Sequence, residues 1–251
     1  MRISFVGIKG GIGKSTIALM VAKELSNRGF NVLFLDRDIF SFASTLAGIK
    51  NSFFTQVARG EIPRDYFKDL GNLTIARLFG EGVLFFKEIE ELHKDLMKKE
   101  VMEKSYAELV KRKKYDFFII DNPPYVTMKS EVVEHELSMF RKIFPNEEIY
   151  RVYLSTGLLE DVEITKKYID ETEAEAPGKA LGIIVNMVVD KEKGIEVLKS
   201  LYDNRFLVGV VIPFIEELFQ FQGSIEDLPV IPQIKNFVDS ILKMEKKIIT
   251  Y

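Results

Sequence analysis

Close to the start of the chain lies a glycine-rich segment with the sequence Lys9-Gly10-Gly11-Ile12-Gly13-Lys14-Ser15-Thr16. The apolar run at residues 3–8 predicts a buried strand before it, and residues 17–25 predict a helix after it. A strand, a glycine-rich turn, a Lys-Ser pair and a helix, in this order, are typical of a phosphate-binding loop. Lys14 is expected to reach the β- and γ-phosphates, and the Ser15 hydroxyl to ligate Mg²⁺. A glycine-rich turn that binds no ligand is the alternative interpretation.

Strand and helix patterns alternate along the rest of the chain. This alternation predicts an α/β fold with a doubly wound, mostly parallel sheet flanked by helices. Strands are expected at residues 31–35, 72–76, 115–120, 149–154, 181–185 and 206–212. Helices are expected at residues 158–170, around 197–201 and at 234–247, with a polar loop at 171–179. No repeat or linker divides residues 1–251, so we expect a single domain.

The segment 52–114 is the hardest part of the chain to interpret. Its second half, residues 85–114, is charged and has helical spacing. The apolar side of this expected helix consists of Ile89, Leu92, Leu96, Met97, Leu109 and Val110.

Composition limits the classes of protein that the chain can belong to. Charged residues make up 29% of the 251 residues and the net charge is −3, so a uniformly basic nucleic-acid surface is not expected, although a local basic patch stays possible. No apolar run reaches about 18 residues, so no membrane span is expected. The first strand begins at once and leaves no room for a signal peptide, so a cytoplasmic protein is the simplest expectation. The chain has no cysteine, which excludes disulfides and thiolate-held metals.

Acidic residues follow two of the expected strands. Asp36 and Asp38 come after residues 31–35, and Asp121 comes after residues 115–120. Ligands of open parallel sheets bind beyond the carboxyl ends of the strands, so these carboxylates can converge on the phosphate loop. Asp121 fits a Walker B carboxylate that orients Mg²⁺ directly or through water. The alternatives are a turn that Asp121 starts before Pro123-Pro124 and a solvated turn at Asp36.

The loop resembles the deviant Walker A motif of the ParA/MinD family of ATPases, because it has the form K-G-G-x-G-K-[ST] and because Ile8 stands where the general loop pattern has glycine. The family's later elements also have counterparts that cover nearly the whole chain. These counterparts are Asp36-Arg37-Asp38, Asp121-Asn122-Pro123-Pro124, Val185-Asn186 and Ile212-Pro213. The resemblance is closer to the ParA-like partitioning proteins and implies a P-loop NTPase fold.

The resemblance also implies roles for individual residues. Lys9 would reach across a dimer to the partner's nucleotide, and with Lys14 and Asp38, which positions the attacking water, it forms the expected catalytic set. Mg²⁺ would be held by Ser15 and Asp121, with Asp36 nearby. The remaining implied ATP contacts are Gly10, Gly11, Ile12, Gly13, Thr16, Asn186 and Pro213.

Tyr125 departs from the family pattern, which has a glycine at this position. That glycine offers its N–H to the γ-phosphate. A tyrosine can do the same only where its φ is negative and its ring finds room. We therefore expect slow hydrolysis, which suits a timing switch.

The expected function is a slow ATPase that dimerises with ATP and partitions DNA or positions cargo. The partners implied by the resemblance are a second copy of the chain, non-specific DNA and a ParB-like or other activator. Candidate DNA-binding cations are Lys166, Lys167, Lys191, Lys193, Lys199, Arg205, Lys235, Lys243, Lys246 and Lys247. Two alternatives stay open, a MinD-like protein that binds membranes through residues 234–247 and a nucleotide-binding adaptor with little hydrolysis. A ligase or synthetase is less favoured, because no substrate-carboxylate site is visible. The absence of cysteine argues against cluster-bearing relatives of this loop.

Overall fold

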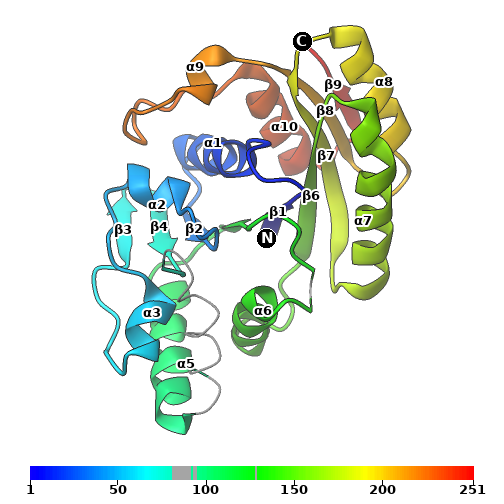
Figure 1. Cartoon of the computed structure of the whole chain (residues 1–251). Helices are drawn as coiled ribbons and strands as arrows, with labels where there is room; N and C mark the ends of the chain where they lie inside the picture. The colour runs from blue at the N-terminus through cyan, green and yellow to red at the C-terminus, as the bar shows by residue number, and fades with distance from the viewer. Residues whose placement is uncertain (81–91, 93–94, 128) are drawn as a thin grey trace.

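The computed structural model describes residues 1–80, 92, 95–127 and 129–251. Within these residues the strands form one sheet in the order β3-β4-β2-β5-β1-β6-β7-β8-β9 (Figure 1). β3 and β4 pair antiparallel and the other neighbours pair parallel. The fold therefore confirms the predicted α/β class. The strands are β1 (Arg2–Val6), β2 (Val32–Asp36), β3 (Phe67–Leu70), β4 (Leu73–Arg77), β5 (Phe117–Asp121), β6 (Ile149–Thr156), β7 (Lys179–Val188), β8 (Val208–Pro213) and β9 (Lys247–Ile249).

Helices cover both faces of this sheet (Figure 1). Three of them share one apolar core, namely α1 (Lys14–Asn27), α2 (Phe42–Leu46) and α10 (Pro232–Lys243). The opposite face packs against α3 (Phe53–Ala58), α5 (Leu96–Lys111), α6 (Glu131–Ile143), α7 (Val162–Glu175) and α8 (Lys191–Leu201). Two short helices, η1 (Leu159–Asp161) and α9 (Glu216–Phe219), follow β6 and β8.

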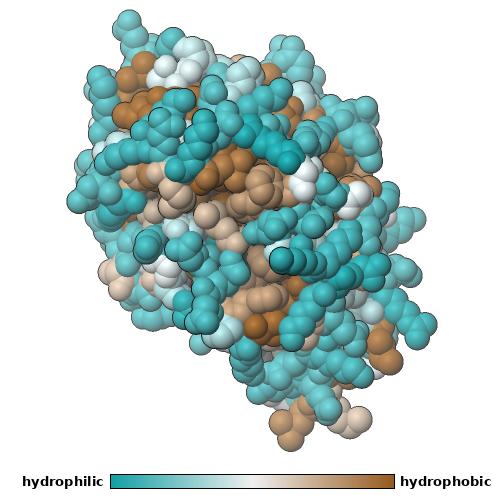
Figure 2. All heavy atoms as spheres, turned by 180° about the vertical axis from the view of Figure 1, so that it is seen from behind, coloured by the Kyte–Doolittle hydropathy of each residue, from teal (hydrophilic) through white to brown (hydrophobic). Residues whose placement is uncertain are grey.

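The surface seen from behind is mostly hydrophilic, and apolar atoms show mainly in hollows between rows of polar side chains (Figure 2). The central strands of the sheet bury both of their faces beneath the helices. Such double burial explains why β2 and β5 are continuous apolar runs up to their final aspartates, rather than alternating ones.

The position of β1 fixes where a ligand can bind. β1 pairs with β5 on one side and β6 on the other, so the chain winds away from it in both directions. A crevice opens at the carboxyl ends of the strands at such a point. The glycine-rich loop, residues 7–13, lies there between β1 and α1.

The helix predicted at 85–114 is only partly correct. Residues 85–91, including Ile89, lie outside the described residues. Leu109 and Val110 are buried as predicted, but Leu96 and Met97 are 85% and 77% exposed. The reason is the helix start: the Asp95 carboxylate accepts from the Met97 and Lys98 N–H groups, and this capped first turn lies outside the core.

Two other predicted boundaries are wrong. The helix predicted at 234–247 ends at Lys243, because Met244 takes a left-handed conformation with φ 51°, and β9 follows it and pairs with β8. The polar loop predicted from residue 171 begins only after Glu175, because α7 continues to that residue. Glu173 explains the longer helix, since its carboxylate accepts from Arg151 and Tyr153 of β6 and from the Ala180 N–H.

Candidate nucleotide and magnesium site

The glycine-rich loop has a shape that only glycine fits at its last position. Gly11 and Gly13 have φ values of 74° and 85°, in the left-handed region. An added Cβ on Gly13 would lie 2.4 Å from the Nδ2 atom of Asn186, which donates to the Ile12 carbonyl at 2.9 Å. Asn186, at the end of β7, therefore holds the loop directly at the start of α1.

Lys14 lies over this loop and is only 4% exposed. Its Nζ atom donates to the Lys9 carbonyl at 3.2 Å. Burial lowers the pKa of Lys14, and the charges of Asp121 and Asp38 oppose this effect. With Ser15, Thr16 and Asp38 it lines a cavity whose other walls are Phe40, Phe42, Pro124, Met187, Leu218, Phe219, Phe221 and three glycines of the loop.

Asp36 and Asp121 lie directly opposite each other at the ends of β2 and β5, and both are fully buried. One oxygen of Asp36 accepts from the N–H and hydroxyl of Ser44 in α2, at 2.9 and 2.7 Å. The other oxygen of Asp36 and both oxygens of Asp121 have no hydrogen-bond partner among the described residues. Buried carboxylate oxygens without partners are costly unless a cation satisfies them.

The electrostatics of this pair also fit a cation. Burial raises the pKa of Asp36 to about 6, and burial followed by the charge of Asp36 raises the pKa of Asp121 well above its usual range. The Ser15 hydroxyl and Lys14 act in the opposite direction on Asp121, so these groups face one another. The described residues hold no group of three His, Cys, Asp or Glu side chains that could bind a metal ion. Mg²⁺ needs fewer, since it keeps waters and phosphate oxygens as ligands, and so Ser15 and one or two carboxylates fit it.

Asp38 begins a tight turn beside the same cavity. Its carboxylate accepts from the Phe40 N–H at 2.9 Å, and its carbonyl accepts from the Ser41 N–H and hydroxyl. Burial raises the pKa of Asp38, and Lys14 lowers it. The carboxylate thus has a fixed direction and a polar neighbour, which suits a group that orients a water molecule.

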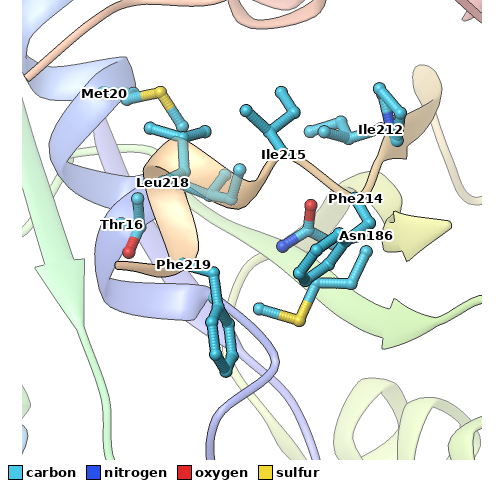
Figure 3. Close-up of a pocket in the computed structure, with 12 residues that line it drawn as sticks. Thr16, Met20, Asn186, Ile212, Phe214, Ile215, Leu218 and Phe219 are labelled. Carbon is cyan, nitrogen blue, oxygen red and sulfur yellow. The ribbon is translucent and has the colours of Figure 1, made fainter. Parts of the chain in front are cut away.

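A second, apolar pocket adjoins the loop (Figure 3). The predicted contacts Gly13, Thr16, Asn186 and Pro213 all line it. Apart from Thr16 and Asn186 the lining side chains are apolar, and they are Ile17, Met20, Met187, Ile212, Pro213, Phe214, Ile215, Leu218 and Phe219. Because the Asn186 amide nitrogen is already bonded to Ile12, its oxygen is left as the acceptor for a ligand. A flat base with an amino group matches these walls.

Lys9 does not point to a ligand in this structure. Its Nζ atom forms an ion pair with Asp161 of η1, whose other oxygen accepts from the Thr156 hydroxyl at 2.7 Å. The Lys9 side chain is 47% exposed. A role across a dimer would therefore require this pair to open.

Tyr125 takes a left-handed backbone conformation that glycine favours, since its φ is 55°. Its N–H donates to the Gly7 carbonyl at 2.9 Å, and its ring stacks on Tyr168 of α7 with centroids 6.0 Å apart. Tyr168 also donates to the Val126 carbonyl at 2.6 Å. The negative φ that a tyrosine would need to offer its N–H to the γ-phosphate is therefore absent, and this N–H is already bonded to Gly7.

The sequence analysis missed a buried polar cluster on the other face of the sheet. Glu136 of α6 accepts from Arg2, Arg37 and Tyr106, and Arg37 also donates to Asn122. Arg2 and Arg37 are 1% exposed and Glu136 is fully buried. One signal was available, since Glu136 stands among Val133, Leu137 and Phe140 on the apolar side of its helix.

The sequence of the chain is similar to a protein family and to several known proteins. A family model described as an AAA domain matches residues 1–133, over half of the chain. The chain is 27% identical over 229 residues to the uncharacterized protein MJECL24 of Methanocaldococcus jannaschii, covering 83% of each protein. It is 29% identical over 142 residues to a cytosolic Fe-S cluster assembly factor NUBP2 homolog of Dictyostelium discoideum, covering 53% of this chain and 51% of that protein.

Solved structures with the same fold include two that contain nucleotides. The MinD septum site-determining protein of Pyrococcus horikoshii, complexed with Mg-ADP, matches with a TM-score of 0.62 and 20% identity over 97% of this chain and 96% of its own. A putative plasmid partition protein of Borrelia burgdorferi, bound to AMPPNP, matches with a TM-score of 0.62 and 18% identity over 97% of both chains. The chain belongs to the AAA domain family whose model matches it, and this match together with the fold of the solved neighbours supports the ParA/MinD family of P-loop ATPases.

Proposed function

We propose that this protein is an ATP-dependent switch that dimerises around ATP and Mg²⁺, hydrolyses ATP slowly and uses the cycle to partition DNA or position cargo. The observation that carries the proposal is the set of unpartnered oxygens on Asp36 and Asp121 beside Lys14 and Ser15. These groups supply the anion site and the cation site of a metal–nucleotide complex in one crevice.

Each group of the site then has a defined task. The loop N–H groups and Lys14 bind the phosphates, and Asn186 and the apolar pocket hold the base. Ser15, Asp36 and Asp121 would hold Mg²⁺, which would neutralise phosphate charge. Asp38 orients the attacking water. Lys9 leaves Asp161 and reaches the nucleotide of the second subunit, where it stabilises negative charge.

The relatives' names support positioning or partitioning as the use of the cycle. One structural neighbour is a septum site-determining protein and another is a putative plasmid partition protein. The name of the NUBP2 homolog refers to Fe-S cluster assembly. We do not propose that role here, because a chain without cysteine has no thiolate to hold a cluster.

The adaptor with little hydrolysis is the second candidate, and Tyr125 favours it. Its N–H is bonded to the Gly7 carbonyl rather than directed to the cavity. The membrane alternative has less support, since α10 buries Ile234, Phe237, Val238 and Ile241 in the core. Among the described residues no helix is long and apolar enough to cross a membrane.

Phosphate release and nucleotide binding separate these candidates. We expect Mg²⁺-dependent ATP binding, turnover below about one per second, and stimulation by double-stranded DNA at low salt that disappears at high salt. ATP binding with no turnover, with or without DNA, favours the adaptor. Turnover well above one per second, within the ordinary enzyme range, contradicts a switch.

A further inference from the structure

The ends of β2 and β5 have two chemically different faces. Successive side chains of a strand point to opposite faces, so Asp36 and Asp121 share one face and Arg37 and Asn122 the other. Asp36 meets Ser44 of α2, whereas Arg37 meets Glu136 of α6. The residues that directly follow these two carboxylates, Arg37 and Asn122, therefore form a hydrogen-bonded pair on the opposite face of the sheet.

Arg37 joins these strand ends through several hydrogen bonds. Its guanidinium donates to the Asn122 carboxamide oxygen and, at 3.1 Å, to Glu136. Its backbone N–H donates to the Asp121 carbonyl at 3.0 Å. The Asn122 amide nitrogen continues the chain of bonds, because it donates to the Phe5 carbonyl of β1 at 2.8 Å. One side chain thus links β2 to β5, and through Asn122 to β1, on which the phosphate loop begins.

Burying the charged groups of this cluster costs desolvation free energy. Burying an ion pair costs several kcal/mol per ion before the partners attract each other, and apolar replacements of the same size often give a more stable protein. A second cation, Arg2, donates to both oxygens of the same Glu136 and lies over the Phe140 ring, and its hydrogen bonds to the described residues do not include Asn122 or the ends of β2 and β5. Of these two equally buried arginines, only Arg37 donates to Asn122, which follows the strand that carries Asp121.

We propose that Arg37 is a positioning residue that holds the ends of β2 and β5 in the register in which Asp36 and Asp121 bind one Mg²⁺. This inference rests on the proposed function, because it needs the Mg²⁺–nucleotide complex. Groups that orient metal ligands from behind typically change metal affinity by about 10- to 100-fold when they are removed. Arg37 is assigned this role, and Glu136 and Asn122 fix its guanidinium.

The test compares Arg37→Met with Arg2→Met, which removes the other cation from the same glutamate. AMPPNP affinity is measured by calorimetry in EDTA and across a MgCl₂ titration, and stability is measured by urea unfolding. Both variants are expected to change the unfolding midpoint. Only Arg37→Met is expected to raise the half-saturating Mg²⁺ concentration, by about tenfold or more, while AMPPNP affinity in EDTA stays within about twofold of wild type.

Equal Mg²⁺ dependence in the two variants overturns the inference and makes the cluster a purely structural one. If Arg37→Met does not fold, Arg37→Lys replaces it. A lysine keeps the buried charge but not the fork that contacts Asn122 and Glu136 together, so the loss of Mg²⁺ affinity should persist. Wild-type protein that binds no AMPPNP at any Mg²⁺ concentration refutes the proposed function and this inference with it. Normal wild-type binding with an unchanged Arg37→Lys refutes the inference alone.

Discussion

Asp36 and Asp121 face each other across neighbouring parallel strands, and three of their four carboxylate oxygens have no hydrogen-bond partner in the described part of the chain. Two buried like charges destabilise a folded protein unless a cation joins them. Burial and the charge of Asp36 raise the pKa of Asp121, so the doubly ionised pair is disfavoured without a ligand and a bound cation would favour it.

Asp36→Asn should stabilise the ligand-free protein at neutral pH. The pKa of Asp36 is raised to about 6 by burial, above the value of about 3.9 in the unfolded chain. The folded state then holds more protons than the unfolded state between about pH 4 and 6, so this group lowers stability as the pH rises through that window. Asparagine keeps an acceptor for Ser44. We expect a gain of up to about 3 kcal/mol at pH 7.5 that vanishes near pH 4, measured by urea unfolding.

Asp203→Asn is the control, because the pKa of Asp203 is shifted in the opposite direction and its substitution should change stability with the opposite sign. Its hydrogen bond with Arg205 lowers the pKa of Asp203, so its charge contributes stability above the unfolded pKa, and that stability is lost as the pH falls. The group is largely solvent-accessible, so its substitution should cost less than about 1 kcal/mol at pH 7.5. If Asp36→Asn also loses stability at pH 7.5, burial of the Asp36 carboxylate does not destabilise the folded protein.

Gly13→Ala and Gly11→Ala distinguish the cost of a positive φ from the cost of a steric clash with Asn186 in the phosphate loop. Both glycines have positive φ, but only an added Cβ on Gly13 meets another atom, the Asn186 amide nitrogen at 2.4 Å, whereas Gly11 has open space. Gly11→Ala should cost about 1 kcal/mol. Gly13→Ala should cost more and should abolish AMPPNP binding, because Asn186 must release the Ile12 carbonyl. Equal effects in thermal melts and calorimetry would falsify the role of Asn186 as a loop support.

Tyr125→Gly and Tyr125→Ala test whether Tyr125, which stands where the family pattern has glycine, limits stability and hydrolysis. Both remove the ring that stacks on Tyr168, but only glycine relieves the positive φ. We expect Tyr125→Gly to be more stable than Tyr125→Ala by about 1 kcal/mol. Its phosphate release should also be severalfold faster, since the segment can swing its N–H from Gly7 to the nucleotide. Unchanged turnover in both variants would mean that Tyr125 does not limit hydrolysis.

Much of the fold could be predicted because the buried parallel strands are continuous apolar runs. The edge strands β3 and β9 could not, because Phe67–Leu70 is half polar and Lys247–Ile249 has three residues. Such strands form only when a neighbour offers hydrogen bonds. Leu96 and Met97 were misassigned because the helical period alone does not tell a core face from a capped, solvent-exposed first turn.

The candidate site was predictable where it depends on local order, as in residues 9–16 and the acids that follow strands. Its support was not. Arg37 and Glu136 are 99 residues apart in the sequence, and their contact exists only because α6 packs behind β2 and β5. The ion pair between Lys9 and Asp161 likewise joins the glycine-rich loop to η1, which only the sheet order brings together.

The central claim is an ATP-gated dimer, and light scattering tests it most directly. Molar mass is measured with ATP–Mg²⁺, ADP–Mg²⁺ or no nucleotide, for wild type, Asp38→Ala and Lys9→Ala. Lys9 is half-exposed, and the buried Asp161 keeps its bond from the Thr156 hydroxyl, so the variant is expected to stay folded, which a thermal melt checks. We expect a dimer only with ATP–Mg²⁺, a longer-lived dimer for Asp38→Ala, and a monomer under all conditions for Lys9→Ala. A mass that ignores nucleotide, or a Lys9→Ala dimer equal to that of wild type, would contradict the account.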